Sequence, residues 1–140
     1  MKRLAYVASA LALLAAAAVV VSPAGAQGEK TPSIKEIMTK ANKPNGLYFN
    51  LSKDLKDDEL IWDEIQKGAK DLAKLAAALA KNEPVKGAKD SWAKLTKDYA
   101  DNAKALDEAA QKKDLRAVQT AHAKLGGMTC MNCHKAHRPK

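Results

Sequence analysis

The chain has few aromatic residues and no concentrated block of one charge. Its 140 residues include two Trp, three Tyr and one Phe, and Tyr6 lies in the apolar segment at the beginning. The formal net charge is +8, but the lysines are spread along the chain and alternate with Asp and Glu. This pattern is typical of solvated helix surfaces. Because aromatic platforms for base stacking are missing as well, we expect no nucleic-acid partner.

Patterns of catalytic residues are also missing. The sequence offers no Ser/His/Asp set, no pair of carboxylates that can be assigned as acid and base, and no glycine-rich phosphate loop. No segment alternates apolar and polar residues over the length of a strand, so we expect no sheet. The sequence therefore predicts an all-α protein that is not an enzyme.

The first 26 residues have the order of a secretory signal peptide. Lys2 and Arg3 precede an apolar run over 4–21, and the small-residue triplet 24–26 follows. We expect cleavage after Ala26, export to the periplasm, and one mature domain over 27–140 that does not associate with a membrane. The alternative is an uncleaved membrane anchor, because an apolar run of this length nearly spans a bilayer.

The first half of the mature domain predicts two helices. The first is expected to begin at Thr31-Pro32, with Thr31 as its N-cap, and to end at Pro44-Asn45-Gly46. A loop should then extend to about Lys56. The second helix is expected near Asp57-Asp58 and continues to about Lys81, since its apolar residues recur at the spacing of one helix face.

The second half predicts two more helices. The third should be capped by Asp90 or Ser91, and the fourth, capped by Asp114, continues towards the two cysteines. Four amphipathic helices with short connections predict an antiparallel four-helix bundle. The residues expected to face inward are Ile34, Ile37, Met38, Ala41, Ile61, Ile65, Ala69, Leu72, Ala76, Leu79, Trp92, Leu95, Tyr99, Ala103, Leu106, Leu115, Val118, Ala121, His122 and Leu125.

One short segment, Cys130-Met131-Asn132-Cys133-His134, carries the chemistry. Helix positions three apart lie on one side, one turn from each other, so two such thiols can add across the two vinyl groups of a haem. The imidazole of His134 then projects from nearby towards the iron. Cys-x-x-Cys-His is a specific haem-attachment pattern. We expect one covalent haem c, bound through Cys130 and Cys133, with His134 as an axial ligand.

Three other interpretations of the cysteines fit the sequence less well than haem attachment. A thioredoxin-like pair would need a βαβ setting, and a structural zinc site usually needs four ligands. A local disulfide would leave His134 without a purpose. Gly126 and Gly127, which lie inside the helical pattern before the motif, indicate either a helix kink or a close approach of haem or a neighbouring helix.

The motif lies close to the carboxyl end, and with four helices this placement resembles the cytochrome c′ family, the class II cytochromes c. The segment from Ile34 to Asn42 is similar to the family's first helix, Trp92 to the tryptophan that opens its third helix, and Arg138 to an Arg found four positions after the haem histidine. The resemblance extends over nearly all of the mature chain. Two positions depart from it: His137 stands where Tyr or Phe is common, and Ile34 where a basic residue often lies near the haem propionates.

The resemblance also bears on the second axial ligand. High-spin members leave that side of the iron open and bind nitric oxide or carbon monoxide, whereas low-spin members place a first-helix Met there and carry electrons. Met38, in a Met-x-Lys-Ala-Asn stretch, is similar to that methionine; the alternative is an ordinary core methionine. We therefore expect one-electron transfer with Met38 as the sixth ligand. The alternative function is a five-coordinate protein that binds nitric oxide or carbon monoxide.

Other polar residues have lesser expected roles. Arg138 and Lys135 are expected either to hold a haem propionate or to be solvated. His137 should approach from the same side as His134, and His122 should be a polar, half-buried helix residue rather than a ligand. The basic surface favours docking to an acidic redox partner. Pairing of two copies, which is common in the family, is left open.

Overall fold

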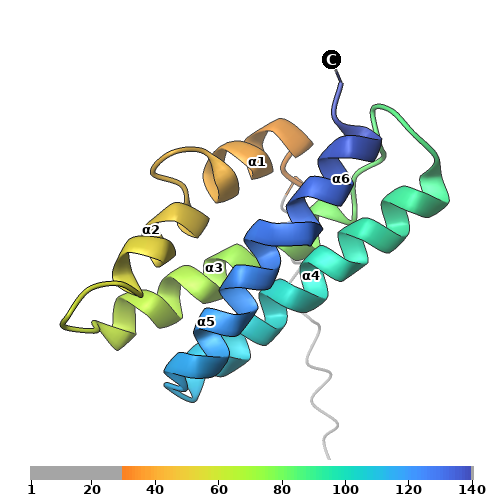
Figure 1. Ribbon diagram of the computed structural model, residues 1–140. Coiled ribbons are helices and arrows are strands. Elements are labelled where there is room, and N and C mark those ends of the chain that lie inside the picture. Colours follow the sequence, from red (N-terminus) through yellow and green to blue (C-terminus); the bar gives the residue numbers. More distant parts are fainter. Residues whose placement is uncertain (1–29, 140) are drawn as a thin grey trace, which may run out of the picture.

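The computed structural model describes residues 30–139, and all regular structure within this range is helical (Figure 1). The predicted signal peptide and its cleavage site lie outside the described residues. Within this range the prediction of an all-α fold is confirmed. The elements are α1 (Ile34–Asn42), α2 (Leu47–Asp54), α3 (Trp62–Leu79), α4 (Lys89–Gln111), α5 (Leu115–Lys124), the π-helical turn η1 (Leu125–Thr129) and α6 (Cys130–His137).

The helices form four rods that pack as a bundle. The two long helices, α3 and α4, pack on each other; α1 and α2 pack on α3, while α5, η1 and α6 pack on α4. Figure 1 shows that α5, η1 and α6 run on as one rod and that successive rods alternate in direction. The first rod is divided into α1 and α2. None of the described helices is both long enough and apolar enough to cross a bilayer.

The predicted loop after the first helix is wrong, because most of it is helix α2. Leu47, Leu51 and Leu55 recur every four residues, and Leu51 and Leu55 are buried in the core. Gly68 on α3 makes room for this contact, since a β-carbon there would lie 3.2 Å from a methyl group of Leu51. The short apolar pattern is therefore a helix that is stabilised by packing on α3.

Two predicted helix starts are also wrong. The N-cap of α1 is Ser33 rather than Thr31: the Ser33 hydroxyl accepts a hydrogen bond from the Glu36 N–H, and the Glu36 carboxylate accepts one from the Ser33 N–H. This reciprocal capping box satisfies donors at the helix start. Helix α3 begins at Trp62 instead of near residue 57, and its N-cap Ile61 is 55% exposed rather than facing inward.

Helix α4 also departs from the prediction at its start and on its inner face. It begins at Lys89, and its N-cap Ala88 has no side-chain hydrogen bond, so neither Asp90 nor Ser91 caps it. Leu95 is only half-buried, while Thr96 is completely buried. The Thr96 hydroxyl donates a hydrogen bond of 2.8 Å to the carbonyl of Trp92, which satisfies this polar group inside the core.

The last rod is capped as predicted and then distorted at its glycines. The Asp114 carboxylate accepts a hydrogen bond of 3.0 Å from the Ala117 N–H. Gly127 has non-helical angles (φ −83°, ψ −118°) within η1. A β-carbon at Gly126 would overlap the hydroxyl of Tyr48 from α2. The sequence left open whether these glycines mark a helix kink or a close approach of haem or a neighbouring helix. The kink occurs at Gly127, and the close approach occurs at Gly126, where it is made by the side chain of Tyr48.

Candidate haem-binding site

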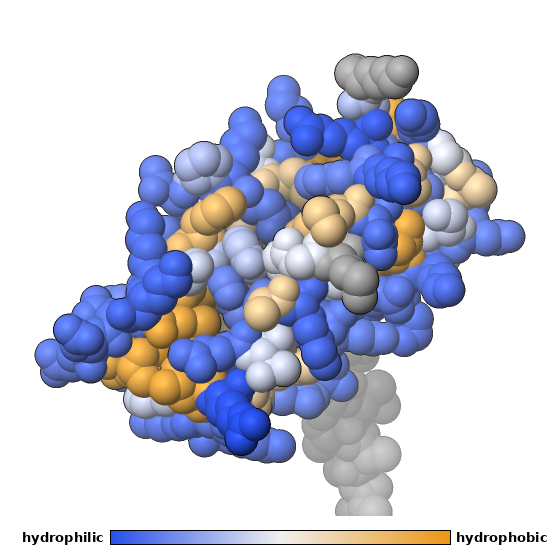
Figure 2. All heavy atoms as spheres, viewed as in Figure 1, coloured by the Kyte–Doolittle hydropathy of each residue, from blue (hydrophilic) through white to orange (hydrophobic). Residues whose placement is uncertain are grey.

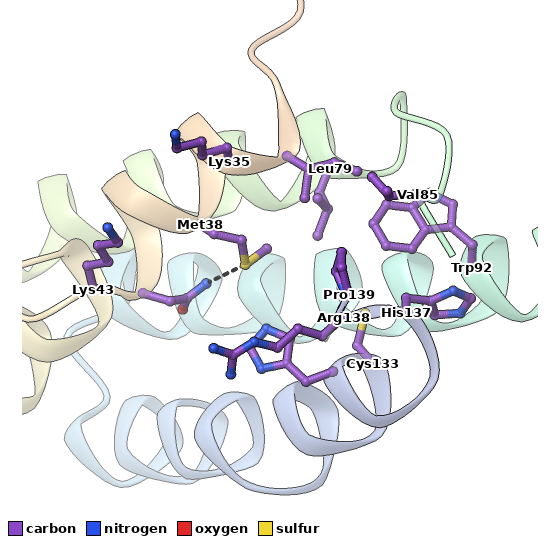
Figure 3. Close-up of a pocket in the computed structure, with 13 residues that line it drawn as sticks. Lys35, Met38, Lys43, Leu79, Val85, Trp92, Cys133, His137, Arg138 and Pro139 are labelled. Atoms are coloured by element: carbon purple, nitrogen blue, oxygen red, sulfur yellow. Dashed lines mark hydrogen bonds between the residues drawn. The ribbon is translucent and has the colours of Figure 1, made fainter. Parts of the chain in front are cut away.

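A cavity of about 540 Å³ lies between α1 and α6 (Figure 3). Met38, Cys133, His134 and Arg138 line it. Cys130 lines a smaller adjoining cavity together with Met38, Cys133 and His134. All five residues predicted for the site, which come from α1, from α6 and from the position just after α6, therefore line these two adjoining cavities.

The position of α1 is fixed by contacts at the end of α3. Ile37 and Ala41 are completely buried in the core. The Asn82 amide, just after α3, donates hydrogen bonds to the carbonyls of Pro32 (3.2 Å) and Ala78 (3.0 Å), while the Asn82 carbonyl accepts one of 2.6 Å from the Trp92 indole. Asn82 thus connects the segment before α1 to α3 and α4, which holds the α1 wall of the cavity.

The two cysteines lie one turn apart at the beginning of α6. Both are half-buried free thiols. Burial raises the pKa of Cys130 and of Cys133, and the neighbouring Cys133 raises that of Cys130 further. Thiols with a raised pKa form little of the thiolate that disulfide exchange and zinc binding need. Residues 30–139 also contain no group of three or more His, Cys, Asp or Glu side chains arranged to hold a metal ion.

Of the three histidines, His122 and His137 are committed to structural contacts. His137 is buried; its Nδ1 lies 2.6 Å from the carbonyl oxygen of Lys86, and its Nε2 lies 3.0 Å from the hydroxyl of Ser91. The Nδ1 must therefore donate, since a carbonyl only accepts. His122 is buried too, with its Nε2 2.9 Å from the carbonyl of Tyr48 and its ring stacked on that tyrosine.

His134 differs from both. It is exposed at the wall of the cavity, and neither of its ring nitrogens makes a hydrogen bond to another residue of the described range. An imidazole without a partner beside two thiols can act as a ligand without breaking any existing contact.

Met38 lies on the opposite wall, on α1, and Figure 3 shows its side chain extending into the cavity. Its sulfur accepts a hydrogen bond from the Asn42 amide, with an Nδ2–Sδ distance of 3.5 Å. The same amide nitrogen lies 3.4 Å from the Tyr99 hydroxyl oxygen. Burial raises the pKa of Tyr99 to about 12, with the hydrogen bond from Asn42 acting in the opposite direction. Tyr99 is therefore protonated at neutral pH.

Sequence reasoning missed Asn42 and Tyr99 as site residues. Asn42 lies four positions after Met38, so their side chains share one face of α1. That signal was present, but an Asn at the end of a helix is usually a capping or surface residue. Tyr99 was predicted only as an inward residue of the third helix, and its approach to Asn42 depends on how α1 packs.

Positive charge is concentrated at the same cavity. Lys35 lines it from α1, Lys43 from the position just after α1 and Arg138 from the position just after α6, whereas no Asp or Glu of the described range does. Ile34, at the position where a basic residue was expected from the resemblance, lines the cavity as an apolar residue. Lys35 and Lys43 supply positive charge on that wall instead. Arg138 is exposed at the cavity, and Lys135 does not line it.

These residues fit a haem. The cavity volume is within the range of about 300–1,000 Å³ that small-molecule sites occupy. One wall offers two thiols one turn apart and an imidazole without a partner, and the opposite wall offers a thioether. The basic residues of the cavity could bind the propionate carboxylates of a haem. Nitrogen and thioether donors of this kind are those found in c-type cytochromes.

Comparisons of the chain with protein-family models, with curated proteins and with solved structures find no match.

Proposed function

We propose that the protein is an exported, periplasmic c-type cytochrome that carries single electrons and is similar to the class II cytochromes c. Its one haem c would be attached through Cys130 and Cys133, with His134 and Met38 as axial ligands. The observation that carries this proposal is that Met38 on α1 and the Cys-x-x-Cys-His motif of α6 line one cavity.

A haem bound at this site would supply a one-electron redox couple. The residues of the proposed site then have separate tasks. Cys130 and Cys133 would anchor the group covalently, and the His134 nitrogen and the Met38 sulfur would bind its iron. Histidine with methionine favours a higher potential than two nitrogen ligands. Arg138, with Lys35 and Lys43, balances the charge of the propionates.

The walls of the cavity support rapid electron exchange. Leu79 and Trp92 line it and are almost completely buried, so they exclude water from that side. A dry, apolar shell tunes the potential of a redox centre. Because α1 and α6 are each packed on a long helix, Met38 and His134 would be held in place, and little rearrangement would accompany the change in charge.

The edge of the cavity suits contact with another protein. Val85, in the segment between α3 and α4, lines the cavity and is 74% exposed. Lys35, Lys43 and Arg138 line the same cavity. An exposed apolar residue and basic residues at one cavity favour an acidic redox partner, and association should weaken as salt increases.

Mass and absorption measurements test the proposal. Protein produced together with the haem-attachment machinery should be heavier than its polypeptide by one haem, and the denatured, acid-washed protein should keep its colour. A bare polypeptide mass would contradict the proposal. The oxidised protein should be low-spin.

Substitution of Met38 separates electron transfer from gas binding. Met38→Ala should convert low-spin into high-spin iron that is open to carbon monoxide, because the sulfur ligand is lost. Met131→Ala is the matched control, since Met131 is 64% exposed and does not line the cavity, and it should leave the spectrum unchanged. A wild-type protein that is already high-spin and binds carbon monoxide would favour the gas-binding alternative.

A further inference from the structure

Three side chains form a hydrogen-bonded chain that ends on the Met38 sulfur. The Asn42 Nδ2 lies 3.5 Å from the sulfur of Met38 and 3.4 Å from the hydroxyl oxygen of Tyr99. Asn42 and Met38 belong to α1, whereas Tyr99 belongs to α4 and is 5% exposed. The amide is therefore held between the sulfur and a buried residue of another helix.

The chemistry of the three groups fixes the direction of these hydrogen bonds. A thioether sulfur can only accept, so the amide nitrogen and not the amide oxygen must face Met38. The amide has two protons, and its second one is directed to the Tyr99 oxygen. The Tyr99 oxygen accepts this proton at 3.4 Å, and burial, which raises the pKa of Tyr99, keeps its hydroxyl neutral.

A thioether sulfur has two lone pairs, and this number decides what Asn42 can do. Where one lone pair accepts the amide proton, the other remains available to a metal. A hydrogen bond to a ligand atom also withdraws electron density from it, which weakens donation to iron(III) more than to iron(II).

We propose that Asn42 is a positioning residue for Met38, and that Tyr99 holds Asn42 in place. Asn42 selects which sulfur lone pair faces the iron and raises the reduction potential. This inference rests on the proposed His134 and Met38 ligation.

Three variants of the haem-loaded protein test it: Asn42→Leu, Tyr99→Phe and Tyr48→Phe. Asn42→Leu removes the donor at nearly constant size, and Tyr99→Phe removes only the hydroxyl that holds the amide. Tyr48→Phe is the matched control. Burial and the neighbouring Cys130 raise the pKa of Tyr48, so its hydroxyl is also partly buried near the motif, but Tyr48 has no hydrogen bond to Asn42 or Met38. The readouts are the reduction potential, the affinity of the ferric protein for imidazole, and the NMR signals of the Met38 methyl group in the ferrous protein.

Asn42→Leu should lower the reduction potential, because the Met38 sulfur without its hydrogen bond donates more strongly to iron(III). For the same reason imidazole should bind the ferric protein between about twofold and about tenfold more weakly, the range expected for one hydrogen bond. The Met38 methyl signal should broaden or double as both lone pairs become available. Tyr99→Phe should change the same quantities in the same direction by less, and Tyr48→Phe should change none of them.

Other results overturn the inference. A lower unfolding midpoint with unchanged potential and imidazole affinity would show that Asn42 only supports the fold. A raised potential would show that only the polarity of the cavity matters. If Asn42→Leu does not fold, Tyr99→Phe tests the inference in its place. An imidazole affinity of Tyr99→Phe equal to that of the wild type would reject the inference. A wild-type protein without the methyl signal of a coordinated methionine overturns both this inference and the proposed Met38 ligation.

Discussion

The two halves of the last helical rod use their inward sides differently. Helix α5 buries Val118, Ala121 and His122, whereas α6 buries only His137. The inward side chains of α6 face the cavity instead, and they include two thiols and an imidazole. A helix that presents reactive groups to a cavity gains little from packing. We therefore expect α5 to be stabilised by the protein core and α6 by the group that fills the cavity.

The π-helical turn η1 between α5 and α6 allows the two helices to differ in this way. Gly127 departs from helical angles and Gly126 receives the Tyr48 side chain, so α6 is not required to continue the line of α5. The exposed surface also differs between the two ends of the bundle. In Figure 2, apolar side chains gather at the far end of the bundle, between α2, the beginning of α3 and α5, while the α6 end is more polar. Four changes test the comparison, from the largest expected effect to the smallest.

Replacing both cysteines, Cys130→Ala with Cys133→Ala, should have the largest effect. Covalent haem should fall from one per chain to none, and the free energy of unfolding should fall by more than about 4 kcal/mol, the stabilisation that a tightly bound ligand gives. Intact mass and denaturant titration measure the two effects. A haem that survives acid washing in the double variant would show that the thiols do not attach it.

Val118→Ala tests the α5 half. Val118 is completely buried, and removing two methyl groups should cost about 2 kcal/mol through lost transfer energy and the cavity left behind. The absorption spectrum should stay as in the wild type, because the change is distant from the motif. Met131→Ala on α6 is the control and should change the free energy of unfolding by less than about 0.5 kcal/mol. Equal effects of the two changes would remove the contrast between the helices.

Gly126→Ala tests the junction. The new β-carbon would overlap the Tyr48 hydroxyl, so the tyrosine must move, at a cost of about 1 to 3 kcal/mol. Thermal unfolding of Gly126→Ala, Tyr48→Ala and the double variant forms a cycle. The glycine substitution should cost less in the Tyr48→Ala background, since the obstacle is then absent. Strictly additive effects would mean that the two residues do not compete for the same space.

The smallest effect concerns His122 and pH. Burial lowers the pKa of His122, against the opposing effect of its hydrogen bond to the Tyr48 carbonyl. Below the ordinary value of 6.5 the unfolded chain binds a proton that the folded chain does not, so stability should be lost as pH falls through 6.5 towards the lowered value. His122→Gln should flatten this part of the stability curve. Identical slopes for the two proteins would place the cause elsewhere.

Much of the fold was predictable because the relevant signals are local. The inward stripe of the second predicted helix, Ile65 to Leu79, is buried as predicted, since helical spacing alone puts these residues on one face. The same reasoning failed for Leu95 and Thr96. Their burial depends on which neighbours surround α4, and the Thr96 hydroxyl is satisfied by a backbone carbonyl that no spacing rule includes.

The sequence by itself determined the helical class and the Cys-x-x-Cys-His spacing, and it predicted an export signal, because each depends on residues within a few positions of one another. Only the tertiary structure decided that Met38 lies across a cavity from His134, that Asn42 donates to its sulfur, and that His122 and His137 are committed elsewhere. These relations join distant parts of the chain. They depend on how α1 packs on α3 and α6 on α4, which no local pattern specifies.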